Sequence, residues 1–371
     1  MAHPVVHFSQ HLFGGTLVQV LADESDDLTS LIEAESAVIG RYGQAVAWPH
    51  KRVNMFVLQD LGPIVAQIGR VVALPTLVAA DLGLGPMVNL YDLGNFEECS
   101  IFINRSALEC TGQWTDAAAL QGLLAHEHGH PLGENITTAS VRHLSLALQI
   151  TGIRDNTIPA SAASHASGEP NLFGGMASVL QTLFIKLTVK APQEIFANET
   201  AIRAGFGEDL YRLDERHLAT LEAGLSRRGE LVGLLDRAVA ERRLGKDGRT
   251  LLLLVGDLQI ILPFVLETSA FLRARERSFA ERLDTRLSRL SCGQVLEPVL
   301  DLYDGLRDHC ATLDPGLSVD SVRAWCEAGV MPLKQALAAA GLDLEISFPA
   351  MASPQPSVAL AARERALNET P

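Results

Sequence analysis

Residues 115–130 read TDAAALQGLLAHEHGH, an apolar segment that ends in three histidines and one glutamate. The segment predicts a helix with Thr115 as its N-terminal cap. Four helical residues turn through about 400°, so His126 and His130 lie one turn apart on the same face. Two imidazoles at this HExxH spacing can bind one zinc ion. The segment therefore predicts a metal site on a helix.

Glu127 and His128 lie on other faces of the same helix. Glu127 is about 100° round from His126, where its carboxylate can hydrogen-bond a water held by the metal and accept its proton as a general base. His128 points about 200° away from His126 and cannot join the site without breaking the helix. We interpret His128 as a surface histidine, or as one that supports a ligand from behind.

A catalytic zinc needs a third protein ligand and an open position for water. The metzincin pattern would place that ligand at position 136, which is Ile136. Glu194 is the better candidate, because it lies in the first turn of a helix predicted to start at Pro192. Glu199 is the competing carboxylate, about 140° round that helix. Asn198 shares the face of Glu194 and could orient a ligand histidine.

The surrounding segments predict an α+β fold in which helices predominate. Two short strands are expected within residues 86–104, and a helix within residues 26–43. From residue 213 to about residue 340 one helix follows another. The expected divisions are a mainly helical N-terminal segment at 1–85, a catalytic core at 86–205, a helical C-terminal region at 206–345 and a tail at 346–371.

The strand region, the HEHGH segment and the later EIFANETA segment (Glu194–Ala201) resemble the gluzincin metallopeptidases of the HtpX and CAAX-prenyl-protease type. In that family a strand precedes HExGH, and a later ExxxD helix supplies a glutamate ligand. The resemblance covers residues 86–205 and implies a zincin-like core with a short antiparallel sheet. It implies zinc on His126, His130 and Glu194, with Glu127 as general base. It also implies a strand that guides an extended peptide: Ser100, Ile101, Phe102, Ile103 and Asn104.

The chain departs from the family pattern at three positions. His128 stands where the family has an apolar residue, and Asn198 stands where it has aspartate. Pro131 directly follows the second histidine and is expected to end the helix at that ligand. The membrane helices common in the HtpX branch are also missing, which favours a soluble relative over a close member.

The family also stabilises the oxyanion of the reaction with a cation or a hydroxyl group. Tyr211, His217 and Arg203 lie in the corresponding downstream region, and the sequence does not choose among them. Three further histidines, His3, His7 and His11, recur every four residues and could line one face of a helix as a second metal site. Their position at a chain end makes fraying the more common outcome.

Composition limits the partners and the compartment. The net charge of −14 argues against nucleic acid or an anionic membrane surface as the main partner. Prolines and charged residues interrupt the apolar stretches Val71–Leu93 and Thr250–Leu272, so no integral membrane segment is expected. The N-terminus lacks the pattern of a secretory signal, and the five cysteines form no CxxC pair. We expect a cytoplasmic protein whose cysteines are structural thiols.

These patterns favour a soluble zinc-dependent metallopeptidase that acts on a peptide or protein substrate. One alternative is a metal-dependent hydrolase or peptide-modifying enzyme that uses the same ligands, with zinc or with iron. The other alternative is a helical scaffold or interaction protein whose metal site is degenerate. Metal content and cleavage of generic peptides distinguish the three.

Overall fold

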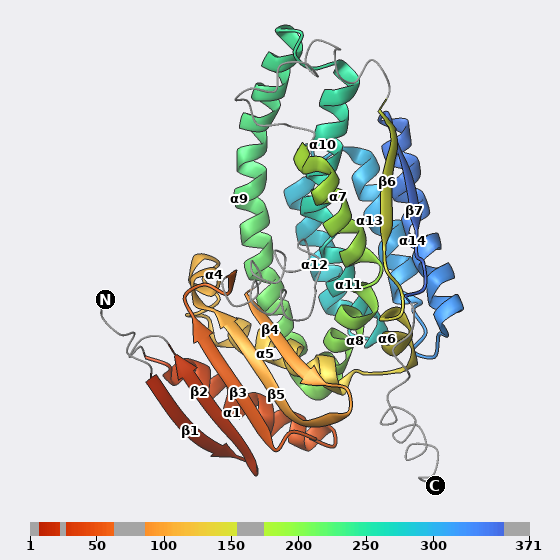
Figure 1. Ribbon diagram of the computed structural model, residues 1–371. Coiled ribbons are helices and arrows are strands. Elements are labelled where there is room, and N and C mark those ends of the chain that lie inside the picture. The colour runs from red at the N-terminus through yellow and green to blue at the C-terminus, as the bar shows by residue number, and fades with distance from the viewer. Residues whose placement is uncertain (1–6, 23–26, 63–85, 154–173, 352–371) are drawn as a thin grey trace, which may run out of the picture. The chain divides into compact units, whose positions relative to one another are not determined.

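A computed structural model of the chain describes residues 7–22, 27–62, 86–153 and 174–351 (Figure 1). These residues are mostly helical and include a small mixed sheet, so the predicted α+β class is confirmed. They form two compact units. The first unit contains the described residues up to Glu134 together with Phe196–His217, and the second contains Asn135–Ile195 and the described residues from Leu218 onward.

The first unit is built on a five-stranded sheet with the order β1-β2-β3-β5-β4. The pairs β1-β2 and β5-β4 are antiparallel, whereas β2-β3 and β3-β5 are parallel. The sheet is therefore mixed, and the expected short antiparallel sheet accounts for only part of it. Its strands are β1 (His7–Phe13), β2 (Thr16–Ala22), β3 (Arg52–Leu58), β4 (Met87–Asp92) and β5 (Asn95–Asn104).

Helices pack on the buried face of this sheet. Val18, Val53 and Cys99 are paired neighbours on β2, β3 and β5, and all three are buried. The helical elements of the unit are α1 (Thr29–Ala45), α4 (Arg105–Cys110), α5 (Ala117–Leu132), the later part of α8 (Ala191–Ala201), the π-helical turn η1 (Ile202–Phe206) and the start of α9 (Gly207–Ala240). Helices α1 and α5 contact each other, and the Tyr42 hydroxyl donates to the Ala125 carbonyl at 2.7 Å.

The N-terminal region differs from the expected mainly helical segment. Its described part contains three strands and the helix α1. The reason is visible in the burial of β2, which alternates residue by residue as a half-buried strand requires. His7 and His11 consequently lie on strand β1 and not on a helix, and His3 lies outside the described residues.

The N-terminal cap of helix α5 lies one residue later than expected. Asp116, not Thr115, caps it, because the Asp116 carboxylate accepts from the Ala119 N–H at 3.3 Å. Arg212 and Arg216 form ion pairs with Asp116 at 2.8 and 2.6 Å. Burial opposes ionisation of Asp116, but the hydrogen bonds from Arg216, Ala119 and Arg212 lower the pKa of its carboxyl group. The cap thus also ties α5 to α9.

Helix α5 does not end at the second histidine as expected from Pro131. Pro131 lies inside the last turn, and the helix runs on to Leu132. The N–H of Gly133 then donates to the Gly129 carbonyl at 2.7 Å. A proline in the last turn is tolerated because few helical hydrogen bonds remain beyond it.

The second unit consists mainly of helices and confirms the predicted succession. Two strands also pair antiparallel within it, an element that the sequence did not reveal. Its further elements are α6 (Ile136–Val141), β6 (Ala147–Ile153), α7 (Gly174–Leu187), α10 (Lys246–Ile261), α11 (Phe264–Arg273), α12 (Arg277–Ser291), α13 (Glu297–Ala311), α14 (Val319–Ala339) and β7 (Leu342–Ser347).

Among the described residues, one helical stretch is long and apolar enough to cross a membrane by length and composition alone. It is Lys246–Arg273, and 61% of its most apolar window is buried inside the protein. Asp257 within it is held by Arg228 through two hydrogen bonds of 2.7 and 2.8 Å. Core helices of water-soluble proteins pass the same test, so the stretch is weak evidence for a membrane span. Residues 71–85 of the other apolar stretch lie outside the described residues.

Candidate metal centre

Three predicted ligands converge in the structure. His126, His130 and Glu194 each offer one ligand atom, and these atoms all lie within 4.8 Å of one another. The two histidines come from α5, where their ring centroids are 4.7 Å apart. Glu194 comes from α8, one turn before Asn198 on the same uninterrupted helix. Two imidazoles and a carboxylate form one of the donor sets that catalytic zinc sites use.

Asn198 supports the first histidine. Its amide Oδ1 lies 2.7 Å from Nδ1 of His126, and the side chain is only 8% exposed. An amide oxygen can only accept, so the bond places the imidazole proton on Nδ1 and the lone pair on Nε2. A hydrogen bond of this kind fixes the orientation and the tautomer of a histidine that binds metal. The expected supporting role of Asn198 agrees with this contact.

Glycines on α5 allow the helices that carry the centre to approach closely. A Cβ atom at Gly129 would lie 2.4 Å from the carbonyl oxygen of Ala197 on α8. A Cβ atom at Gly122 would lie 2.5 Å from the carbonyl oxygen of Asp209 on α9. Real Cβ atoms essentially never come so near backbone atoms. The backbones of α5, α8 and α9 can therefore pack at these points only without a side chain.

Glu127 lies beside the edge of the sheet. It is 6% exposed, and its backbone carbonyl accepts a hydrogen bond of 2.9 Å from the Asn89 amide on β4. Strand β4 is the last strand in the order of the sheet and contacts α5. The predicted general base is therefore held next to an edge strand.

The strand expected to guide a peptide is not at an edge. Ser100, Ile101, Phe102, Ile103 and Asn104 belong to β5, which pairs with β3 on one side and with β4 on the other. Its backbone donors and acceptors are already used in the two ladders, so a peptide cannot add to it. Among the described strands next to α5, it is β4 that has a neighbour on one side only.

Glu199, the competing carboxylate, is used elsewhere. It forms an ion pair of 2.5 Å with Arg203, one turn further along the chain. The Arg203 side chain is 65% exposed. Glu199 is not part of the group of ligand atoms around His126. The structure therefore favours Glu194 as the third ligand, and it ties the oxyanion candidate Arg203 to Glu199.

The other two oxyanion candidates, Tyr211 and His217, both lie on α9. The Tyr211 side chain is buried, with 2% exposure, and His217 contacts two neighbouring side chains. Nε2 of His217 lies 3.2 Å from the Gln113 amide nitrogen, and Nδ1 lies 3.7 Å from the Asp214 carboxylate. Burial raises the pKa of Asp214 well above its usual value, and the nearby His126 partly opposes this shift. Sequence reasoning missed Asp214, although its spacing from His217 is that of neighbours on a helix face.

His128 is completely buried, so the expectation of a surface position is wrong. It faces away from His126 as predicted, and its Nε2 lies 2.9 Å from a Glu35 carboxylate oxygen. Burial opposes protonation of His128, but Glu35 and Cys99 raise its pKa to about 10. Burial and the neighbouring His128 lower the pKa of His50 to about 3. The sequence did not reveal the cluster of His50, Cys99 and His128, because its members lie far apart along the chain.

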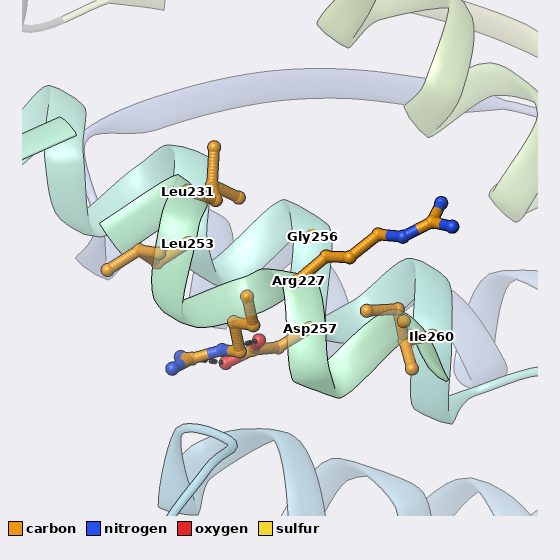
Figure 2. A pocket seen from close by; sticks show the side chains of 8 residues that line it. Arg227, Leu231, Leu253, Gly256, Asp257 and Ile260 are labelled. Atoms are coloured by element: carbon orange, nitrogen blue, oxygen red, sulfur yellow. Dashed lines mark hydrogen bonds and ion pairs between the residues drawn. The ribbon is translucent and has the colours of Figure 1, made fainter. Parts of the chain in front are cut away.

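A shallow hollow in the second unit contains none of the predicted site residues (Figure 2). Two of its lining residues, Arg228 and Asp257, form a bidentate ion pair between α9 and α10. Asp257 also accepts a hydrogen bond of 2.9 Å from the Leu296 N–H. These contacts give the pair a structural role. The hollow is lined by residues such as Gly224, Arg227, Leu231, Leu253, Gly256 and Ile260.

No family, curated protein or solved structure matches. Comparisons of this chain with models of protein families, with curated proteins and with solved structures all give this result. The functional argument therefore rests on the residues of the centre.

Replacing Asn198 by alanine is expected to weaken zinc binding by about 10- to 100-fold, because His126 loses the partner that fixes its ring. Competition with a chromogenic chelator would measure the affinity. Asn198→Asp is the matched control: a carboxylate accepts the same hydrogen bond, so affinity should stay at or above that of the wild type. Equal affinities in the alanine variant and the wild type would contradict the supporting role.

Proposed function

We propose that this chain is a zinc-dependent metallopeptidase. The observation that supports it best is the convergence of His126, His130 and Glu194 beside Glu127. Two helical histidines and a later glutamate form a three-ligand set, which is the number that catalytic zinc sites use when they leave a position open. Bound zinc would polarise the peptide carbonyl and lower the pKa of water.

The residues of the chain have separate roles in this proposal. The Glu127 carboxylate accepts a proton from the attacking water and later passes it to the leaving amine. Asn198 holds His126 in the tautomer that presents Nε2. Of the three candidate donors to the developing oxyanion, Arg203 is already paired with Glu199, so Tyr211 and His217 remain.

The peptide substrate binds along β4 in this proposal. An extended peptide can add to a strand that has a partner on one side only, and main-chain hydrogen bonds then position it. Asn89 on β4 contacts the backbone of Glu127, so a peptide paired with β4 would run close to the general base. The edge position of β4 supports a peptide as the substrate in this proposal.

The first test is metal content together with peptide cleavage. Protein purified without added metal is analysed by mass spectrometry, and wild type is compared with His126→Ala and Glu194→Gln. We expect each variant to lose one zinc per chain and to lose cleavage of a peptide library. Iron in place of zinc, or metal without any cleavage, would favour a peptide-modifying enzyme. A metal content that is the same in all three proteins would favour a scaffold with a degenerate site.

A further inference from the structure

A second group of metal-binding side chains lies on the opposite side of α5. His50, Cys99 and His128 each offer one ligand atom, and these atoms lie within 4.8 Å of one another. All three residues are buried, with exposures of 2%, 1% and 0%. They come from three places in the first unit: the segment before β3, strand β5 and helix α5. Nothing in the proposed peptidase mechanism uses them.

One ring nitrogen of each imidazole already has a hydrogen-bond acceptor. His128 donates from Nε2 to Glu35 at 2.9 Å, and His50 donates from Nδ1 to the Phe96 carbonyl at 2.6 Å. In the neutral imidazole, which is the form that binds metal, each bond places the proton on that nitrogen and leaves the lone pair on the other. A carboxylate and a backbone carbonyl are the usual partners behind histidines that bind metal.

The other ring nitrogen of each histidine has no hydrogen-bond partner. Nε2 of His50 and Nδ1 of His128 are both buried, and neither has an acceptor or donor. Buried polar atoms of native proteins are nearly always satisfied, so each such atom requires an explanation. A cation bound between the two nitrogens and the Cys99 sulfur would satisfy both at once.

We propose that His50, Cys99 and His128 form a second metal site that binds Zn²⁺ and has a structural role. A thiolate and two imidazoles suit zinc and do not suit calcium or magnesium, which prefer oxygen. Zinc bonds to nitrogen of about 2.0 Å and to sulfur of about 2.3 Å place ligand atoms roughly 3.3–3.8 Å apart, so a small inward shift suffices.

The charges around the group also fit a divalent cation. The Cys99 thiolate and the Glu35 carboxylate together balance the charge of one Zn²⁺ ion. The Trp48 ring packs edge-on against His50 and His128, with centroids 4.7 and 5.1 Å away. The burial of all three ligands keeps a substrate away from the group, which favours a structural role over a catalytic one.

Cobalt substitution distinguishes this site from the centre at His126, because only this site contains a thiolate. The full-length protein is stripped of metal and titrated with Co²⁺, and the cobalt–thiolate charge-transfer absorption is recorded. We expect this absorption in the wild type and in His126→Ala, and we expect it to be absent from Cys99→Ser. Zinc analysis should give one fewer ion in Cys99→Ser than in the wild type. Cys326→Ser, which removes a buried cysteine outside the group, is the matched control and should behave as the wild type.

A second measurement does not depend on whether Cys99→Ser folds. Extended X-ray absorption fine structure at the zinc edge should detect one sulfur and two imidazole neighbours around the zinc that remains in the His126→Ala protein. Absence of cobalt–thiolate absorption from the folded wild type would overturn the proposal, as would absorption that persists in Cys99→Ser. Zinc with no sulfur neighbour in His126→Ala would overturn it as well. Failure of the peptidase proposal would leave all these readouts unchanged.

Discussion

Glu127→Gln is expected to lower the kcat for peptide hydrolysis by about 10²- to 10⁴-fold and to leave the zinc content unchanged. Glutamine has nearly the same shape as glutamate but cannot accept a proton from the attacking water. The hydrogen bond from Asn89 goes to the backbone carbonyl of residue 127, so the substitution keeps it. Steady-state cleavage of a peptide identified by library screening would measure kcat, and mass spectrometry would measure the zinc.

Glu199→Gln is the matched control for this experiment. Glu199 is a glutamate of similar burial on the neighbouring helix α8, but its partner is Arg203. We expect this variant to keep its zinc and to change kcat only a few-fold, because Glu199 lies outside the group of ligand atoms and its partner Arg203 is largely exposed. Unchanged activity in Glu127→Gln would contradict the role of general base. Loss of zinc in Glu199→Gln would instead point to the competing ligand.

The part of the centre that the sequence predicts is the part set by helix geometry. His126 and His130 are one turn apart, and so are Glu194 and Asn198, so helical periodicity alone places each pair on one face. The structure adds that the two helices meet so that the pairs face each other. Periodicity within a helix is local, whereas the meeting of two helices depends on packing.

The errors also have physical causes. The N-terminal region is predicted to be mainly helical because the sequence of β2, TLVQVLA, is apolar at adjacent positions and does not display the alternation of buried and half-buried residues that the structure shows. The family resemblance implies a peptide-guiding role for β5. The sequence does not reveal that β5 lies inside the sheet, because this position depends on its pairing with β3, far away in the sequence. Strand order is a non-local property, and one sequence contains no spacing that encodes it.

The group around Cys99 was beyond sequence reasoning for a similar reason. Its ligands stand at positions 50, 99 and 128 and form none of the short spacings by which zinc sites are recognised. The sequence predicts Cys99 to be a structural thiol and His128 to be a surface or supporting histidine, with no link between them. The side chains of Cys99 and His128 come together only because β5 pairs with its neighbouring strands and because α5 turns His128 away from the face of His126.

Gly129→Ala is expected to destabilise the protein by about 1–3 kcal/mol, even though alanine is the better helix former by about 1 kcal/mol. The new Cβ would meet the Ala197 carbonyl at 2.4 Å, and a backbone atom cannot move aside as a flexible side chain can. Helices α5 and α8 must therefore separate. Denaturant unfolding of the metal-free protein would measure the change in the free energy of unfolding without a contribution from zinc.

Gly224→Ala provides the matched control, because a Cβ atom at this helical glycine would meet nothing within 4 Å. That variant should gain up to about 1 kcal/mol from helix propensity alone. Gly129→Ala should also weaken zinc binding, since separating the helices moves Asn198 away from His126. Stabilisation of both variants would contradict the close approach of α5 and α8. Destabilisation by Gly129→Ala with unchanged zinc affinity would mean that the ligands do not depend on that approach, and the centre would then tolerate changes in helix packing.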